Sequence, residues 1–296
     1  MTVNRHRTLQ PLRNVRFAAV VLMVLTVSAC STRFFYNRID WFVVWKLGDY
    51  VTLTDVQKAD LKADLNDHLE YVRVNEMPRV VEVLNKTARE VESGYITVDM
   101  LDARYSEMLV IYDDFMLGIV PLSMRFLRSL DDEQVQELFE KFEEVNQEMY
   151  EEYSGRTSEE REKNRNKSAV KSTENWTGRL SSEQRQILKD ALARMSDSSE
   201  QWITYQREWQ RRFRILIAER PPEEEYLAEL TQLFVSPRDM HSRSYRDQVD
   251  ANRTVLNVAL AELLTGLTDK QCKRTVKKLD GYAKDLTKLS QSPRSP

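Results

Sequence analysis

Residues on which many protein classes depend are scarce in this chain of 296 residues. It contains two cysteines, seven glycines and eight prolines, while glutamate, leucine, lysine, arginine and glutamine are abundant. Few glycines and prolines leave few turns for β-hairpins, and the abundant residues are good helix formers. We therefore expect an all-α fold, an elongated bundle of long antiparallel helices.

Motifs for catalysis are also missing. The chain has no HExxH, Walker A, GxSxG, CxxC or glycine-rich dinucleotide-binding motif. Beyond residue 29 it has two histidines, His68 and His241, too few and too far apart for a histidine-based zinc site. We expect no enzyme activity, no metal and no cofactor. Carboxylates at Asp113, Asp114 and 133–152 leave a carboxylate enzyme as a third alternative. His68 lies on the apolar stripe of its helix, so we expect a core histidine with its hydrogen bonds satisfied rather than a proton carrier.

The first 29 residues have the layout of a secretory signal peptide. Four arginines and no acidic residue precede an apolar block at 17–27, which is too short for a permanent membrane-spanning helix. Ser28 and Ala29 directly before Cys30 resemble the bacterial lipobox, which implies that Cys30 is lipidated after cleavage. The alternative is ordinary cleavage with an incidental cysteine. Ser31 in place of aspartate implies transport to the outer membrane, where the protein would be lipid-anchored on the periplasmic face.

Removal of residues 1–29 takes away four basic residues, leaving 40 basic against 47 acidic ones and a net charge of −7. This balance argues against nucleic acid as a partner. If Cys30 is acylated, no disulfide forms within the chain. Cys272 shares a helical stripe with other apolar residues, so we expect it to be a buried, unreactive thiol.

Seven aromatic residues mark the lipidated N-terminal segment 30–50: Phe34, Phe35, Tyr36, Trp41, Phe42, Trp45 and Tyr50. Such a run could lie in the membrane interface. It could also close one end of the core as a short helix, which we favour because Asn37, Arg38 and Asp40 interrupt a lipid-facing surface.

Helical periodicity divides the rest into a first half (51–153), a charged linker or helix extension (154–179), a second half (180–289) and a tail (290–296). One helix should start near Thr97 and end at Pro121, with an inward stripe of Leu101, Tyr105, Met108, Tyr112, Phe115 and Ile119. A heptad seam from Leu188 to Leu216 predicts one unbroken helix over 182–220.

A five-residue motif, Leu-[Thr/Asp/Ser]-x-x-Gln, occurs four times. The side chain of its second residue can accept a hydrogen bond from the backbone N–H of the glutamine. The glutamine side chain can in turn accept one from the backbone N–H of the second residue, so that each copy begins a helix with a capping box. The pairs 53–130 and 180–267 suggest two loosely duplicated halves. The copies are Leu53-Thr54-x-x-Gln57, Leu130-Asp131-x-x-Gln134, Leu180-Ser181-x-x-Gln184 and Leu267-Thr268-x-x-Gln271.

These boxes resemble the repeated LTxxQ box of the Spy and CpxP group of periplasmic chaperones, although Asp131 departs from it. Over most of the chain, Cys30, the stretch Phe35 to Trp41 and the box at Leu53 look like an uncharacterised family of Gram-negative lipoproteins. The first resemblance implies a chaperone of the cell envelope, and the second a lipoprotein without a known activity.

We expect a membrane-anchored periplasmic lipoprotein that binds other proteins without catalysis, such as a chaperone-like cradle for unfolded clients. The alternative is a structural adaptor with one dedicated envelope partner. The helix over 131–153 carries ten acidic residues and a single lysine, while 156–179 and 270–288 are basic. Either these segments pair and neutralise each other, or they line a common concave face with the aromatic residues.

Overall fold

The computed structural model describes residues 36–292, which form helices and no strand. This confirms the expected all-α class and its elongated arrangement of long helices. A π-helical turn, η1 (Val72–Glu76), and a 3₁₀ turn, η2 (Pro237–Met240), interrupt the α-helices. The α-helices are α3 (Ile39–Leu47), α4 (Asp55–Tyr71), α5 (Met77–Ser93), α6 (Val98–Arg128), α7 (Asp132–Ser154), α8 (Ser158–Thr177), α9 (Ser182–Arg194), α10 (Ser199–Glu219), α11 (Glu223–Phe234), α12 (Arg243–Thr265) and α13 (Asp269–Gln291).

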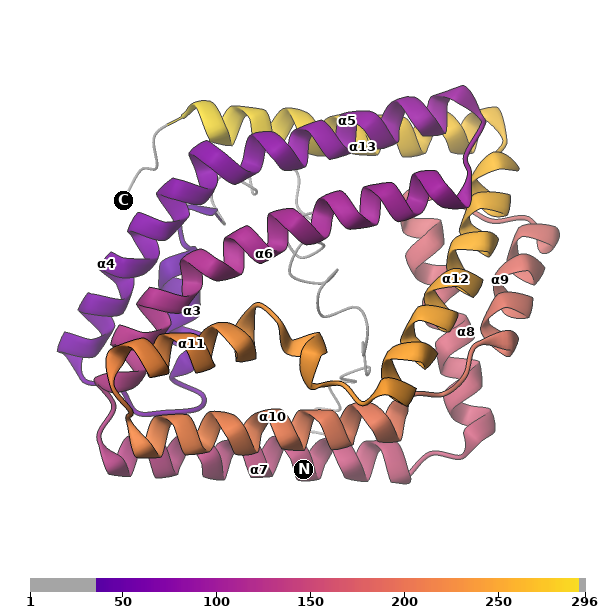
Figure 1. Ribbon diagram of the computed structural model, residues 1–296. Helices are drawn as coiled ribbons and strands as arrows, with labels where there is room; N and C mark the ends of the chain where they lie inside the picture. Colours follow the sequence, from indigo (N-terminus) through magenta and orange to yellow (C-terminus); the bar gives the residue numbers. More distant parts are fainter. Residues whose placement is uncertain (1–35, 293–296) are drawn as a thin grey trace, which may run out of the picture.

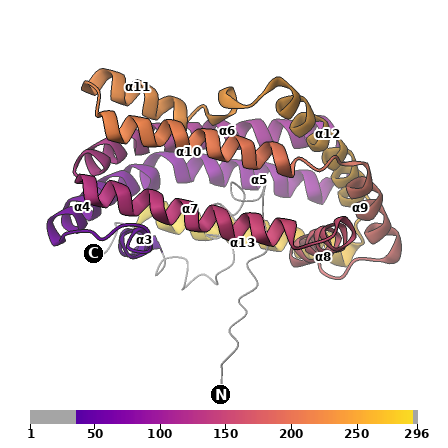
Figure 2. The same cartoon turned by 90° about the horizontal axis from the view of Figure 1, so that it is seen from below.

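The helices form a four-sided frame that α6 crosses (Figure 1). The pairs α5–α13 and α7–α10 make two opposite sides, α8, α9 and α12 the third, and α3 and α4 the fourth, while α11 runs beside α10 and α6. Turned by 90°, α10, α11 and α12 lie on one side of the molecule and α3, α7, α8 and α13 on the other (Figure 2). The long pairs are antiparallel: the Cys272 thiol contacts the Val91 carbonyl near one end of α5–α13, while Met77 and Leu286 share a cluster at the other.

The largest apolar cluster lies where α6, α7, α10 and α11 meet. Ile217, Tyr226 and Leu230 are fully buried there, packed with Val51 and Leu130 from the first half. Truncation of such a leucine to alanine costs about 2–5 kcal/mol. The suggested halves are therefore not separate bodies, since this core draws on both and α13 packs along α5.

The predicted single helix over 182–220 is wrong, because the chain leaves the helix between α9 and α10. Asn252 of α12 accepts a bond from the Ser196 amide and donates one to the Ser196 carbonyl, each at 2.9 Å. Asp197 then accepts from the amide of Ser199 at 2.9 Å. These side-chain bonds replace helical ones at the break, which is why a continuous seam did not produce a continuous helix.

The predicted helix end at Pro121 is also wrong, because α6 continues to Arg128. Proline removes the bond to the carbonyl four residues earlier, that of Leu117. Both residues lie on the exposed side of α6, where the loss is tolerated. Pro78, by contrast, lies in the first turn of α5, directly after η1, where the chain bends between α4 and α5 (Figure 1).

Candidate functional site

Each copy of the repeated motif begins a helix with a capping box: α4, α7, α9 and α13. At the first copy, the backbone N–H of Gln57 donates to Thr54 Oγ1 at 3.2 Å, and Gln57 Oε1 accepts from the backbone N–H of Thr54 at 2.9 Å. The same reciprocal bonds occur between Asp131 and Gln134, Ser181 and Gln184, and Thr268 and Gln271. The box at Asp131 forms as well as the others because a carboxylate also accepts from an amide.

The four glutamines do more than cap, because they join in two pairs. Gln57 and Gln134 each donate Nε2 to the other's Oε1 at 2.8 Å. Gln184 and Gln271 do the same, at 3.1 and 2.8 Å. We call these reciprocal pairs the glutamine clamps. They hold the start of α4 against that of α7, and the start of α9 against that of α13.

The second amide hydrogen of each clamp glutamine binds the backbone just before its partner's box. Gln57 donates to the Ser129 carbonyl and Gln134 to that of Thr52, at 2.8 and 2.7 Å. In the other clamp, Gln184 donates to Gly266 and Gln271 to Arg179, at 3.1 and 3.0 Å. Each carbonyl belongs to the residue before the motif leucine, so the two clamps share one local design.

The clamps explain why the motif requires glutamine. A fifth capping box, Thr157 with Glu160 at the start of α8, is exposed and unclamped, and sequence reasoning missed it because no leucine precedes it. The Ser/Thr-x-x-Glu pattern would have found it. Glutamate can close a capping box, but only an amide can also donate to a partner. The buried clamp glutamines therefore have a structural role and are not accessible to a partner.

One apolar surface that the fold leaves incompletely covered is on α6. Between residues 98 and 119 a single residue of this helix, Ile111, is buried. The predicted inward stripe is half-buried at all six positions: Leu101, Tyr105, Met108, Tyr112, Phe115 and Ile119. We call these six residues the central stripe, since α6 crosses the middle of the frame (Figure 1).

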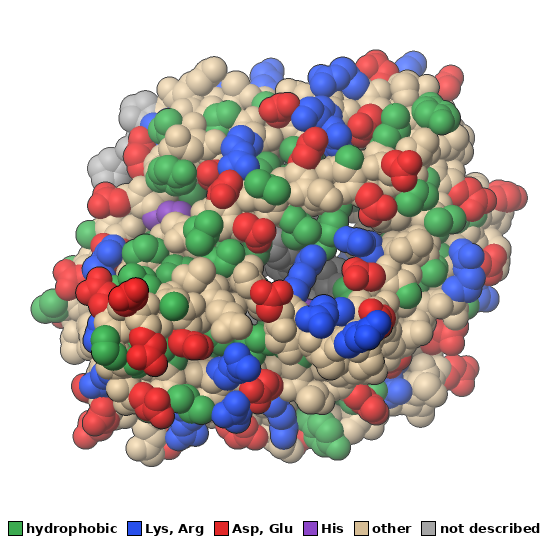
Figure 3. Space-filling model, in the orientation of Figure 1, with side chains coloured by type: hydrophobic (Ala, Val, Ile, Leu, Met, Phe, Trp, Pro, Cys, Tyr) green, Lys and Arg blue, Asp and Glu red, His purple; other side chains and the backbone are tan. Residues whose placement is uncertain are grey.

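Cationic and aromatic side chains face this helix from η2 and α12. The Arg238 guanidinium donates to the Tyr105 hydroxyl, and the Arg253 guanidinium lies 5.0 Å from the centre of the Tyr105 ring. Asp102 accepts a bond from Asn257 at 2.9 Å and lies 3.9 Å from Arg253. Figure 3 shows a hollow in this part of the molecule, with hydrophobic side chains along one side and basic ones along the other.

An aromatic group lies where α10 approaches η2. The His241 ring lies 4.4 Å from that of Tyr205 and 4.5 Å from that of Tyr245. Burial, with the adjacent Arg238 and Arg246, lowers the pKa of His241, while burial raises the pKa of Tyr205 to about 12. Both shifts favour the uncharged forms of His241 and Tyr205, and positive charge near the hollow comes from arginine.

The pKa of Asp113 is raised by burial, and the nearby positive charge of Arg238 offsets part of this rise. The hollow thus combines apolar side chains with charges of both signs. This combination is suited to polypeptide surfaces, since apolar contact supplies binding free energy and charge speeds encounter.

The acidic helix α7 and the basic helices α8 and α13 do not pair along their lengths, apart from Glu152 with Arg156 at 2.7 Å at the start of the basic segment. With the aromatic helix α3 they lie on the same side of the molecule (Figure 2). Acidic α7 packs against α10, while basic α8 and α13 pack against each other through Trp176 and Tyr282. Among residues 36–292, no ion pair joins α7 to α8 or α13. The arginines that face the central stripe, Arg238 and Arg253, come from η2 and α12.

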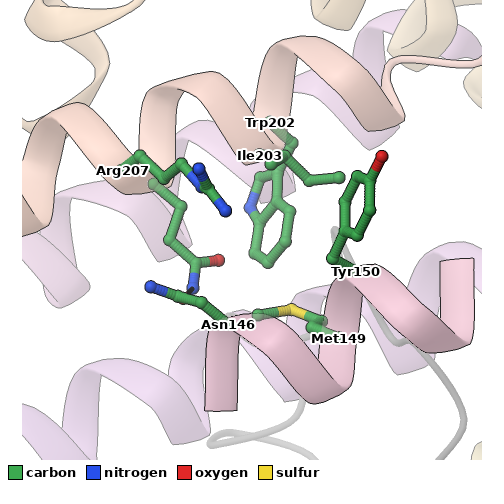
Figure 4. Close-up of a pocket in the computed structure, with 7 residues that line it drawn as sticks. Asn146, Met149, Tyr150, Trp202, Ile203 and Arg207 are labelled. Carbon is green, nitrogen blue, oxygen red and sulfur yellow. Dashed lines mark hydrogen bonds between the residues drawn. The ribbon is translucent and has the colours of Figure 1, made fainter. Parts of the chain in front are cut away.

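A pocket between α7 and α10 is too small for an organic ligand (Figure 4). Its cavity volume is about 10 Å³, room for roughly one water molecule. Asn146, Gln206 and Gln210 form a hydrogen-bonded network beside it, at 2.7 to 3.2 Å. We interpret it as a polar packing seam.

Two expectations about single side chains need correction. His68 is buried against Phe115, but its Nε2 has no hydrogen-bond partner among the described residues, so the prediction of a satisfied histidine is wrong. Cys272 is half-buried rather than buried. No group of three or more histidine, cysteine or acidic residues in 36–292 could hold a metal ion.

The predicted signal peptide (1–29), Cys30, Phe34 and Phe35 lie outside the described residues. Within the described range the aromatic segment is divided: Tyr36 is buried, whereas Trp41 and Trp45 are exposed. No helix between residues 36 and 292 is both long enough and apolar enough to cross a bilayer.

Comparison with known proteins gives a family match without an activity. A family of unknown function (DUF6279) matches residues 49–246. No curated protein and no solved structure matches the chain. The matched range contains the central stripe, Arg238, His241 and the first clamp, but of the second clamp it contains Gln184 without Gln271.

Proposed function

Since this chain belongs to a family of unknown function (DUF6279), we propose its function from its own residues: it is a periplasmic lipoprotein that binds other polypeptides without catalysis. Its clients would be unfolded or partly folded chains of the cell envelope. The binding surface is the central stripe of α6 with the arginines of η2 and α12.

The lipid anchor is supported by the N-terminal sequence. The arginine-rich leader, the short apolar block and Ser28-Ala29-Cys30 together resemble a lipoprotein signal. Two or more acyl chains on Cys30 would give stable attachment, which a single chain does not. Ser31 supports the outer membrane as the destination, with the helical frame in the periplasm.

The single observation that carries the binding function is the incomplete burial of the central stripe. A helix with this apolar content normally buries one face in a core, but six apolar positions of α6 are only partly buried. Arg238 and Arg253 lie against the ring of Tyr105, one of the six. Contiguous apolar surface next to charge marks a site of protein contact.

The resemblance to periplasmic chaperones supports unfolded clients, but not through the repeated boxes themselves. In this chain the box glutamines are buried in the clamps, where a client could not reach them. The boxes therefore maintain the frame, and the client contact is assigned to α6.

The proposal is tested by aggregation of a denatured client. We expect the mature chain without its lipid, residues 31–296, to slow aggregation of two or three unrelated denatured proteins without ATP. Added salt should weaken the effect, because it screens charges beyond about 8 Å near 0.15 M. The double substitution Met108→Ser and Tyr112→Ser should reduce suppression several-fold.

The matched control is Val56→Ser on α4, a residue that is 69% exposed and lies outside the central stripe. Circular dichroism must show that all variants stay folded. Absence of suppression by the unmodified protein at several-fold molar excess would remove the chaperone function. The dedicated adaptor would then take first place, tested by capture of partners with the native lipoprotein.

A further inference from the structure

Two tryptophans on α3 are exposed at the surface of the frame. Trp41 and Trp45 are each 53% exposed, and their rings stack 6.1 Å apart and within 6° of parallel. The two residues are one helical turn apart, so they share a face of α3. The ring of Phe42 lies 5.6 Å from that of Trp45 and extends the same aromatic surface.

An adjacent face of α3 is already covered by the chain itself. Val44 is buried against Leu61 and Leu65 of α4 and Leu122 of α6. A helix on the surface of a soluble protein usually turns polar residues outward. α3 instead presents stacked tryptophans, so its outer face is suited to an environment other than bulk water.

The position of α3 in the chain points to a bilayer as that environment. Tyr36, the first described residue, is buried and donates a hydrogen bond to the Leu69 carbonyl, which fixes the start of this segment to the frame. Cys30 lies six residues earlier, a span of at most about 20 Å. A lipid on Cys30 would therefore keep α3 beside the membrane surface.

Tryptophan is favoured where headgroups meet acyl chains, because its ring is largely apolar and carries one N–H donor. Lys46, exposed on the same helix, adds a positive charge suited to lipid phosphate, although it also pairs with Asp49 at 2.7 Å. We propose that Trp41 and Trp45 insert into the headgroup region of the bilayer that holds Cys30. The inference rests on the proposed lipid anchor, and it gives the frame a second attachment that sets its orientation.

The test measures tryptophan fluorescence of the native lipidated protein in vesicles of phosphatidylethanolamine and phosphatidylglycerol. A fraction of the lipid carries bromine on the acyl chains near the headgroup, where it quenches tryptophans that it touches. The other three tryptophans, Trp176, Trp202 and Trp209, are half-buried within the frame. We expect quenching in the unmodified protein, its loss in the Trp41→Phe/Trp45→Phe variant, and its retention in the control Trp176→Phe.

Absence of quenching, or quenching unchanged in the double variant, would overturn the proposal. A blue shift of emission that grows with protein concentration and ignores bromine would also overturn it, and would assign the tryptophans to a second copy of this chain. Labelling of Cys30 by a fatty-acid probe in the same sample separates the two proposals. Labelled but unquenched protein refutes the tryptophan contact alone, while quenched but unlabelled protein refutes the anchor alone.

Discussion

The substitution Gln57→Glu separates the capping function of the repeated motif from its clamp. Glutamate keeps an oxygen for the Thr54 amide and for Nε2 of Gln134. It loses the amide hydrogens that Gln57 donates to the Ser129 carbonyl and to Gln134 Oε1, both at 2.8 Å. The capping box therefore remains possible while the clamp loses half of its bonds.

The magnitude follows from burial. Gln57 is 9% exposed, so the new carboxylate is largely removed from water and one of its oxygens faces Gln134 Oε1. A buried acceptor left without its donor costs about 1–3 kcal/mol, and an uncompensated buried charge adds to this. We expect a loss of about 2–5 kcal/mol in the free energy of unfolding, which lowers Tm by roughly 4–10 °C for a chain of this size.

The assay is urea unfolding followed by circular dichroism on residues 31–296, with Gln136→Glu as the matched control. Gln136 lies on the exposed side of α7, where the same change should stay within about 0.5 kcal/mol. Gln184→Glu should resemble Gln57→Glu, because the second clamp repeats the first. If Gln57→Glu proves no more destabilising than Gln136→Glu, the clamp contributes no stability and the reasoning is wrong.

Three further predictions follow from other parts of the chain. Cys30→Ser should leave an unlipidated precursor that a fatty-acid probe no longer labels, and unchanged labelling would contradict the lipoprotein assignment. Gly118→Ala would place a Cβ 2.4 Å from His68 Cε1, so it should lower stability by about 1–3 kcal/mol in thermal unfolding, while Ala103→Ser on the exposed side of α6 should change little. Burial, with Arg238 and Arg246, lowers the pKa of His241 in the folded state, so the unfolded chain takes up its proton first and stability should fall as pH drops from the unfolded pKa near 6.5 through the lowered folded pKa. His241→Gln should flatten this slope, and an unchanged slope would show that the shift has no effect on stability.

Helix starts were the most predictable part of this fold, because a capping box is contained in four consecutive residues. Thr54 and Gln57, for example, predict the start of α4 from their spacing alone. The clamp was not predictable in this way, since Gln57 and Gln134 are 77 residues apart and their pairing depends on how α4 and α7 pack. The one sequence signal for the clamp was that all four copies have glutamine at the last position, although glutamate would also close a capping box.

The break between α9 and α10 shows the limit of periodicity. The seam spacing runs from Met195 through the polar Ser199 to Trp202, but Asn252, 56 residues after Ser196, binds both backbone groups of Ser196. The central stripe shows the same limit for burial. Helical spacing identified which side of α6 is apolar, but it could not show that the frame leaves Tyr105 and Tyr112 only half-covered.

The central claim, that α6 binds polypeptides in the envelope, is tested most directly by photocrosslinking in living cells. A photoreactive phenylalanine analogue placed at Met108 in the native full-length chain should capture many unrelated polypeptides on illumination, and the same group at Val56 should capture few. Capture of one recurrent protein from position 108 would indicate the dedicated adaptor. Equal capture from both positions, or none from position 108, would contradict the assignment of the binding surface to the central stripe.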